Sequence, residues 1–193
     1  MTVRSETKGT ARERLLAAAD ELFYEEGVRT VGIDRVIEHA GVAKASLYNT
    51  FGSKEALIRA YLDRRGTRTT ERITREVARH EEPRDRVLAV FDAQRELSAE
   101  QGYRGCPFVR ASAEAHAGDQ VEQASNDYRG WLRALLTELA GQAGAPDPAM
   151  LARQLMLVYD GGSLSARMDH DPSAYTVSRA AAETLLTAAL GTA

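Results

Sequence analysis

Apolar residues recur at intervals of three and four positions along almost the whole of this 193-residue chain. That spacing gathers them on one face of a helix, whereas the sustained alternation that marks a β-strand does not occur. Alanine, the residue with the highest helix propensity, is also abundant. We therefore predict an all-helical fold in which each helix buries one apolar stripe.

Capping residues and helix breakers divide this pattern into separate helices. Thr10, with Glu13 three residues later, predicts a capping box, and Gly27 is suited to end the helix that it opens. Asp147-Pro148 and Asp171-Pro172 each combine a capping carboxylate with a proline suited to the first helical position. The predicted helices span about residues 11–26, 30–39, 43–51, 54–68, 69–79, 87–97, 108–116, 119–139, 149–168 and 173–190.

The composition excludes several classes of protein. A single cysteine, Cys106, excludes an intrachain disulfide framework and a cysteine-based zinc finger. No apolar run approaches the roughly 18 residues that a membrane span requires, and the charged N-terminus is not followed by the apolar segment of a secretory signal. We therefore expect a cytoplasmic protein that has no membrane partner.

Charge is distributed unevenly along the chain. The formal net charge is −3, but residues 1–75 carry a balance of +3 and residues 76–193 carry −6. The overall acidity disfavours a protein that coats nucleic acid without specificity. A basic face in the N-terminal part remains compatible with local contact to DNA.

The most informative segment runs from residue 30 to residue 54. Two short helices flank Ala40-Gly41-Val42, a spacing typical of a helix-turn-helix, in which the second helix lies in the major groove of DNA. In that second helix Leu47 and Phe51 form a narrow apolar side, and the remaining positions are small or polar. An ordinary helical hairpin with one solvated face would give the same pattern.

The polar side chains of the second helix are of the types that form hydrogen bonds with DNA bases and phosphates. The amide of Asn49 can pair with adenine, and the ammonium group of Lys44 can reach guanine or phosphate. Hydroxyl groups that can donate to phosphate oxygens belong to Ser46, Tyr48 and Thr50. Lys54 lies in the first turn of the following helix, whose free N–H groups favour an anion.

The same stretch resembles the DNA-binding domain of the TetR family of bacterial transcriptional repressors. The resemblance covers residues 11 to about 65 and is carried by GVAKASLYNTFGSKEALIRAYL, preceded by TVGIDRVIEHA and RLLAAADELFYEEGV. Two departures stand out: Ala43 replaces a frequent capping serine, and Val31-Gly32 replaces the usual hydroxyl residues. Phosphate contacts at those positions must therefore come from backbone N–H groups or be absent.

The resemblance implies a three-helix DNA-binding domain and an all-helical C-terminal domain. It divides the chain into an N-terminal arm at residues 1–9, a DNA-binding domain at 10–68 with its helix-turn-helix at about 31–50, and an effector-binding and dimerisation domain at 69–193. The residues that it implies at the operator are Lys44, Ala45, Ser46, Tyr48, Asn49, Thr50 and Lys54.

The resemblance also implies a homodimer, because two recognition helices spaced by one DNA turn read a palindromic operator. The closing helices carry stripes of small and apolar residues that suit such an interface, although a core inside one chain would explain any single residue equally well. The predicted interface residues are Leu151, Leu155, Tyr159, Gly162, Ser163, Ala166, Ala181, Leu185 and Ala189.

A pocket for a small-molecule effector is a further expectation from the resemblance. Large or adaptable side chains line typical ligand sites, and the same residues also suit an ordinary core. The predicted lining residues are Phe91, Tyr103, Phe108, Tyr128, Trp131, Met156 and Tyr159. The sequence leaves open whether the effector is neutral, cationic or anionic.

Other functions have less support in the sequence. The four histidines lack paired ligand spacing and no catalytic motif occurs, so we expect neither an enzyme nor a metal or other cofactor. A metal cluster of Glu114, His116 and Asp119 is conceivable but lacks cysteine partners. Two alternatives remain: a redox-responsive regulator acting through Cys106, which lies between two arginines, and a helical interaction module that no longer binds DNA.

Overall fold

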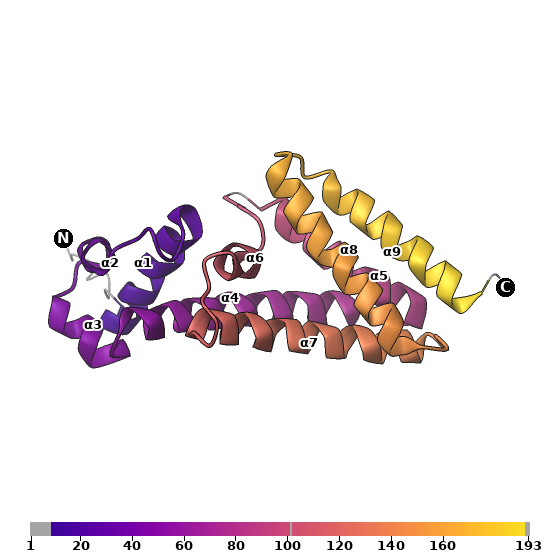
Figure 1. The fold of residues 1–193 in the computed structure, drawn as a ribbon, viewed down its shortest axis with the longest axis horizontal. Helices are drawn as coiled ribbons and strands as arrows, with labels where there is room; N and C mark the ends of the chain where they lie inside the picture. Colours follow the sequence, from indigo (N-terminus) through magenta and orange to yellow (C-terminus); the bar gives the residue numbers. More distant parts are fainter. Residues whose placement is uncertain (1–8, 101, 192–193) are drawn as a thin grey trace, which may run out of the picture.

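The structure, a computed structural model, describes residues 9–100 and 102–191 (Figure 1). Within these ranges every regular element is an α-helix, which confirms the predicted all-helical class. The predicted arm at residues 1–9 lies outside the described residues except for Gly9. The helices are α1 (Ala11–Glu26), α2 (Ile33–Ala40), α3 (Lys44–Phe51), α4 (Lys54–Val77), α5 (Pro83–Ser98), α6 (Pro107–Ser112), α7 (Gln120–Gln142), α8 (Pro148–Met168) and α9 (Ala174–Leu190).

Side-chain caps determine where several helices begin. The predicted capping box is present: the Thr10 hydroxyl accepts a hydrogen bond from the Glu13 N–H at 3.2 Å, and the Glu13 carboxylate accepts one from the Thr10 N–H at 2.8 Å. The Asp147 carboxylate caps α8 by accepting from the Met150 N–H at 3.0 Å. These bonds satisfy N–H groups that have no partner inside the helix.

Several predicted boundaries are wrong, and the helix predicted at 87–97, for example, begins at Pro83. The helix predicted from residue 30 begins at Ile33, because Val31 is buried in the core and Gly32 takes the N-cap position. The helix predicted at 108–116 is the shorter α6. Asp171 does not cap α9; its carboxylate binds the backbone N–H and hydroxyl of Ser173, and the helix begins one residue after that serine.

One long helix, α4, replaces the two predicted at 54–68 and 69–79, so the predicted domain boundary at residue 68 falls inside a continuous helix. Near its start Tyr61 packs edge-on against Phe23 of α1, with ring centroids 5.7 Å apart. Further along, Gly66 lies against the Phe108 ring of α6. The helix therefore contributes to two parts of the core, and it runs beside α7 along the length of the molecule (Figure 1).

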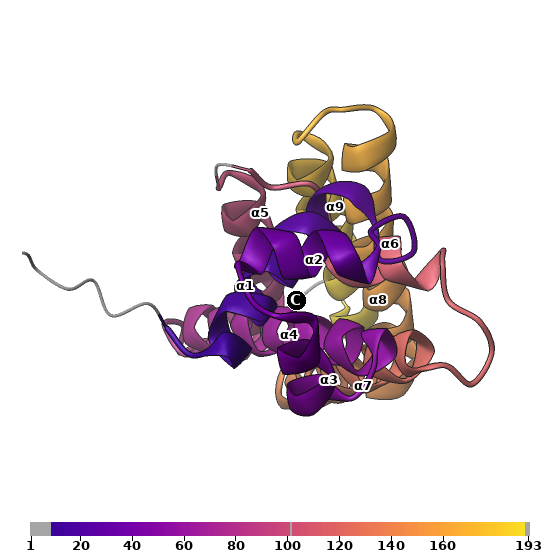
Figure 2. The same ribbon diagram turned by 90° about the vertical axis from the view of Figure 1, so that its left-hand side faces the viewer.

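The first three helices and the start of α4 form one small bundle at the N-terminal end (Figure 2). Leu15, Val36 and Leu47 are fully buried in it. Arg14 of α1 donates to the carbonyl oxygens of Ala40 and Gly41, at 3.4 and 2.9 Å, and so holds the turn between α2 and α3. Gly41 ends α2 in the left-handed conformation, with φ of 60°.

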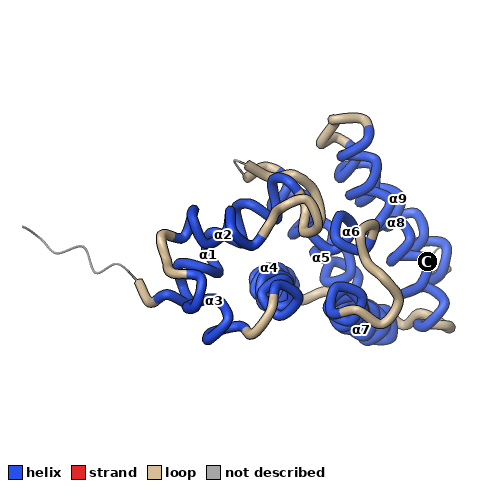
Figure 3. The backbone as a smooth tube through the Cα atoms, turned by 60° about the vertical axis from the view of Figure 1, so that its left-hand side comes forward, coloured by secondary structure: helices blue, strands red, loops and turns tan. Residues whose placement is uncertain are grey.

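The remaining helices form the larger bundle, in which α8 and α9 pack side by side (Figures 1 and 3). Gly162 of α8 faces Ser178 of α9 so closely that a Cβ atom at Gly162 would lie 2.7 Å from the serine Cβ. The sequence predicts that small residues of α8 let a helix of a second chain approach closely. At Gly162 a helix does approach closely, but it is α9 of the same chain.

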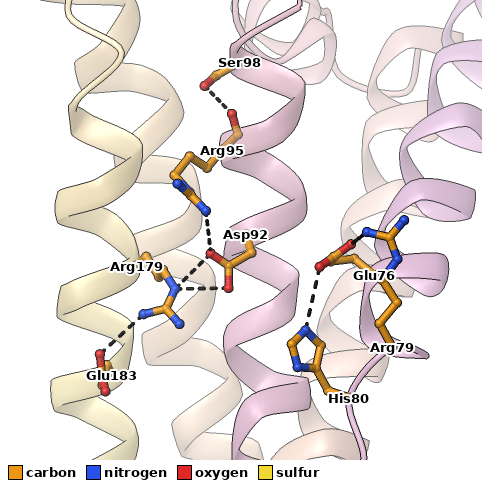
Figure 4. A network of polar contacts seen from close by, with 8 residues as sticks. All are labelled: Glu76, Arg79, His80, Asp92, Arg95, Ser98, Arg179 and Glu183. Atoms are coloured by element: carbon orange, nitrogen blue, oxygen red, sulfur yellow. Dashed lines mark hydrogen bonds and ion pairs between the residues drawn. The ribbon is translucent and has the colours of Figure 1, made fainter.

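Ion pairs fasten α9 to α5 on the outside of this bundle (Figure 4). The Asp92 carboxylate of α5 accepts from Arg179 of α9 at 2.9 Å and from Arg95 at 3.3 Å. Arg179 also reaches Glu183, at 3.4 Å. Because these groups are partly exposed, they orient the two helices more than they stabilise the fold.

Replacing Gly162 with alanine is expected to lower the free energy of unfolding by about 1–3 kcal/mol, because the new methyl group would overlap Ser178. Gly130→Ala is the matched control, since a Cβ there meets nothing within 4 Å; we expect that variant to keep or gain stability by up to about 1 kcal/mol. Denaturant unfolding followed by circular dichroism measures both.

Adding Ser178→Gly to Gly162→Ala should recover part of the lost stability, because the atom that overlaps the methyl group is then removed. Equal effects of the two alanine substitutions, or no recovery in the double variant, would contradict this account of the α8–α9 contact.

Candidate nucleic-acid interface

The helix predicted to read DNA, α3, is attached to the bundle by a narrow apolar side. Leu47 is its only fully buried side chain, and Phe51 is half-buried beneath the guanidinium group of Arg12, 5.5 Å from the ring centroid. Most other positions of this helix are exposed. A side chain on that surface can meet a ligand without any change in the core.

Six of the seven predicted DNA-contact residues lie on α3 and have side chains that reach solvent, and five of these have no side-chain hydrogen bond within that helix: Lys44, Ala45, Ser46, Tyr48 and Asn49. The Lys44 ammonium forms an ion pair with Asp34 of α2 at 2.8 Å, and this carboxylate raises the lysine pKa. Both partners are well exposed, so a phosphate group can replace the carboxylate at little cost. Tyr48 is 47% exposed, unusually high for an aromatic side chain.

The other two predicted contacts are engaged within the protein. The Thr50 hydroxyl donates to the Ser46 carbonyl at 2.6 Å, so its proton is already used inside α3. The Lys54 ammonium donates to the Arg29 carbonyl at 3.4 Å and lies in a small pocket beside the start of α7. Burial lowers the pKa of this lysine. Thr50 must give up its internal bond before it can donate to a phosphate, whereas the Lys54 ammonium has three N–H donors and can keep its bond to Arg29 while it holds one.

Hydrogen bonds join the end of α1 to the loop before α6. The Tyr24 hydroxyl donates to the Gly105 carbonyl at 2.9 Å and accepts from the Arg104 N–H at 2.8 Å. Arg110 donates to the carbonyl oxygens of Tyr24 and Glu25. The sequence did not predict these hydrogen bonds between α1 and the loop before α6, because the partners are about 80 residues apart and no spacing rule connects them.

A second joint lies between Arg29 and the segment before α7. The Arg29 N–H donates to the Glu114 carboxylate at 2.9 Å, and its guanidinium pairs with Asp119 at 3.6 Å. Asp119 also caps α7 and accepts from the His116 N–H. The acidic members of the conceivable metal cluster thus bind protein groups, and the described residues contain no group of three or more ligands arranged to hold a metal ion.

The predicted effector residues mostly pack against one another. Phe108 stacks on Tyr128 at 4.2 Å between centroids, Tyr128 on Trp131 at 6.4 Å, and Phe91 meets Tyr159 edge-on at 5.8 Å. Met156 is buried as well. These contacts belong to a packed core, and the predicted effector pocket stays a prediction. The exception is Tyr103, which borders two open cavities.

Four of the predicted dimer-interface residues are also core residues of the single chain. Leu151, Leu155, Tyr159 and Ser163 are each less than 5% exposed within a single chain. The buried Gln94 of α5, for instance, donates to the Tyr159 carbonyl and the Ser163 hydroxyl. A second chain cannot reach side chains that the first chain already covers.

Other predicted interface residues are less deeply covered. Gly162 is buried against α9, whereas Ala166, Ala181, Leu185 and Ala189 are half-buried. The apolar surface that faces solvent has different members, which recur at helical spacing on α8 and continue on α9. Its large members are Met150, Leu157, Leu164, Met168 and Val177.

Cys106 lies at the N-cap position of α6. Burial raises the pKa of its thiol, although hydrogen bonds from the backbone N–H groups of Val109 and Phe108 oppose that effect. A raised pKa leaves less thiolate at neutral pH, and thiolate is the form that reacts with oxidants. The local chemistry therefore disfavours the redox alternative.

Comparisons with known proteins agree with this geometry. The family model described as bacterial regulatory proteins, tetR family, matches residues 15–61, which span α1, α2, α3 and the start of α4. The crystal structure of a TetR-family transcriptional regulator from Streptomyces coelicolor superposes with a TM-score of 0.86 at 31% identity, covering 94% of this chain and 96% of that one.

The chain belongs to the TetR family of bacterial transcriptional regulators. It is thus a DNA-binding, helix-turn-helix regulator, and both the fold and the relatives are those of regulators rather than enzymes. The crystal structure of Escherichia coli NemR in its reduced form is also similar, with a TM-score of 0.79 at 25% identity over 91% of this chain and 97% of that one.

Sequence relatives match this TetR-family chain over a shorter stretch. The transcriptional repressor NemR of Escherichia coli is 34% identical over 110 residues, which are 56% of this chain and 55% of NemR. An HTH-type regulator of Mycobacterium tuberculosis is 36% identical over 78 residues, or 39% of its own length. The chain thus spans about two fifths to just over half of these relatives.

None of the helices in the described residues is both long and apolar enough to cross a membrane.

We expect the Cys106 thiol of the folded regulator to react with a disulfide reagent such as DTNB about tenfold or more slowly than the same thiol in guanidinium chloride. Burial raises its pKa, so at pH 8 the thiolate fraction is smaller in the folded protein. Absorbance of the released thionitrobenzoate gives both rates. Equal rates would show that the thiol is accessible in the folded protein and would support a redox-responsive regulator acting through Cys106.

Proposed function

We propose that this chain is a ligand-responsive repressor that binds a palindromic operator as a homodimer. The observation that carries the proposal is the contrast between the two sides of α3, where Leu47 anchors the helix and Lys44, Tyr48 and Asn49 project to solvent. A helix held in this way can enter a major groove and leave its own bundle undisturbed.

The contacts at the operator divide into two kinds. Asn49, whose amide is exposed, is suited to pair bidentately with adenine and so to recognise sequence. Lys44 and Tyr48 are suited to phosphate oxygens, which position the protein without specifying a base. Thr50 joins them only if its hydrogen bond to the Ser46 carbonyl is exchanged for a bond to DNA, whereas Lys54 can keep its bond to the Arg29 carbonyl and use its other N–H groups.

The partner surface that we propose is the exposed apolar face of α8 and α9, in place of the buried stripe predicted from sequence. Leu157 is 74% exposed and Val177 is 66% exposed. Side chains of that size seldom gather at a solvent surface without a function in binding. A twofold pair joined there would present two copies of α3, as a palindrome separated by one turn of roughly 34–36 Å requires.

Ligand control follows from linkage between binding and conformation. An effector releases DNA only if it binds more tightly to a conformation in which the two α3 helices do not match the operator. Coupling of about 1–3 kcal/mol, or roughly 5–150-fold in affinity, is typical of such regulators. The joint between α1 and the loop before α6 is the proposed route, since it connects the DNA-binding bundle to the larger one.

Substitution of Asn49 by alanine is expected to weaken binding to the specific operator by roughly tenfold or more and to leave binding to unrelated DNA almost unchanged. Lys44→Ala should weaken both, because a phosphate contact is independent of sequence. Fluorescence anisotropy with a duplex from upstream of the gene, at two salt concentrations, measures these affinities.

The control for these two variants is Arg133→Ala, which removes a charge from the exposed side of α7 and should leave both affinities unchanged. If the wild-type protein binds no duplex even at low salt, the chain is instead an interaction module that has lost DNA binding.

Replacing both Leu157 and Leu164 with glutamate is expected to yield folded monomers, because four charges would then face one another across the proposed twofold interface. Both side chains are exposed in the single chain, so its helical content and melting should change little. Light scattering after size-exclusion chromatography measures the mass, and the monomer should lose most of its operator affinity.

The matched control for the dimer is Ala134→Glu, which adds a charge to the exposed side of α7. We expect it to remain dimeric. A double glutamate variant that keeps the mass of a dimer would refute the proposed surface, and a monomer with undiminished operator affinity would refute the need for a dimer.

A further inference from the structure

An open cleft of about 480 Å³ lies where the end of α1, the loop before α6 and the turn between α8 and α9 meet. Its volume falls in the range of small-molecule sites. The aromatic rings of Tyr103 and Tyr175 meet edge-on there, with their hydroxyl oxygens 2.7 Å apart. This cleft is separate from the filled aromatic core that the sequence suggested as the effector site.

The charge of the cleft is opposite to that of the chain. Four of its lining residues are basic, Arg104, Arg110, Arg167 and His170, whereas Glu25 is the single acidic residue in the lining. The chain as a whole has a net charge of −3. Arginines clustered in one cleft of an acidic protein create a local positive potential, and such a potential is suited to attract an anionic ligand.

Of the three arginines that line the cleft, two have no carboxylate partner. Arg110 donates to backbone carbonyl oxygens, which satisfy its N–H groups but do not neutralise its charge. Arg167 lays its aliphatic stem against Gly105, and neither it nor His170 forms an ion pair within residues 9–100 and 102–191. Only Arg104 has an acidic partner, Glu25, at 3.3 Å.

A neighbouring cavity along α4 shows the difference. It is also lined by arginines, but Asp20 pairs with Arg65 and Arg68, and Glu100 pairs with Arg72. Its positive charges are thus largely neutralised inside the protein. The cleft at the turn between α8 and α9 has cations in excess, so it is the better site for an anion.

The polar groups of the cleft are suited to bind an anion rather than only to attract it. Burial raises the pKa of Tyr103 and of Tyr175, so both hydroxyl groups keep their protons. A hydrogen bond joins the two oxygens, and because Tyr175 is only 1% exposed, Tyr103 is the member of the pair that is more accessible from the cleft. His170, which also lines the cleft, has a φ of 54°, the one positive φ among the described residues other than glycine.

We propose that this cleft binds the effector, and that the effector is a small organic anion, a carboxylate or phosphate ester joined to an apolar or aromatic body. Arginine pairs with both groups through two parallel hydrogen bonds. The Tyr103 ring and Pro172 provide the surface for the apolar body. The assignment to an effector rests on the proposed repressor function, whereas binding of the anion does not.

The geometry also gives the anion a route to the DNA-binding bundle. Glu25 is the penultimate residue of α1, and its pair with Arg104 helps to hold α1 against the loop before α6. An incoming anion competes with Glu25 for the same guanidinium group. The conformation in which that pair is broken therefore binds the ligand more tightly, which is the differential affinity that a release mechanism needs.

The test uses three probes with the same ring system: 2-naphthoate, 2-naphthyl phosphate and the uncharged 2-naphthamide. Isothermal titration of the full chain without DNA should show that at least one anion binds about tenfold or more tightly than the amide. Arg167→Gln with His170→Gln should weaken binding of that anion by about tenfold or more, and Arg133→Gln, the control on α7, should leave it unchanged.

Several results would overturn the proposal: equal affinity for the amide and the anions, an unchanged affinity in the double variant, or no binding of either anion up to about 10 mM. Both substituted side chains are solvent-exposed, so the variant should keep its thermal unfolding curve. A preference for one anion supports the site and identifies whether carboxylate or phosphate ester is the ligand class.

Operator binding is measured separately, by anisotropy with and without the bound probe. Release of the operator by the anion in the wild-type protein, but not in the double variant, supports its role as effector. If the anion binds through Arg167 and His170 but leaves operator affinity unchanged, the result supports the anion site. It refutes the assignment of the anion as the effector. Failure of the unliganded protein to bind any duplex would count against the proposed repressor function alone.

Discussion

The continuity of α4 is the constraint on which the rest of the structure depends. The short helices α1, α2 and α3 cannot bury enough apolar surface to be stable by themselves, and α4 completes their core through contacts such as Tyr61 against Phe23. The same helix then enters the larger bundle, where Gly66 admits the Phe108 ring. Because one rigid helix contributes to both cores, a displacement in either bundle is transmitted to the other through the backbone.

The distribution of charge adapts an acidic chain to anionic partners. Lys44 is the one charged residue on the polar surface of α3, and several arginines gather around the cleft that contains Arg167. Elsewhere most arginines are paired with carboxylates, as Arg179 is with Asp92. An overall net charge of −3 therefore says little about the potential that a ligand meets at either surface.

Features fixed by local rules were predictable from the sequence, and features that depend on distant partners were not. The capping box of Thr10 and the contrast between Leu47 and its exposed neighbours follow from spacing within a few residues. Spacing also showed that α8 has an apolar stripe, but it could not show that Leu155 faces its own chain whereas Leu157 faces solvent. The lining of the cleft comes from segments up to 150 residues apart, and no sequence periodicity links them.

The Tyr24 hydroxyl has a consequence for how the two bundles move. It gives its proton to the Gly105 carbonyl and receives one from the N–H of the adjacent residue, Arg104. Both bonds meet at one oxygen, so a shift of the loop that breaks one also removes the geometry of the other. A displacement of α1 away from this loop therefore costs two hydrogen bonds that share one oxygen.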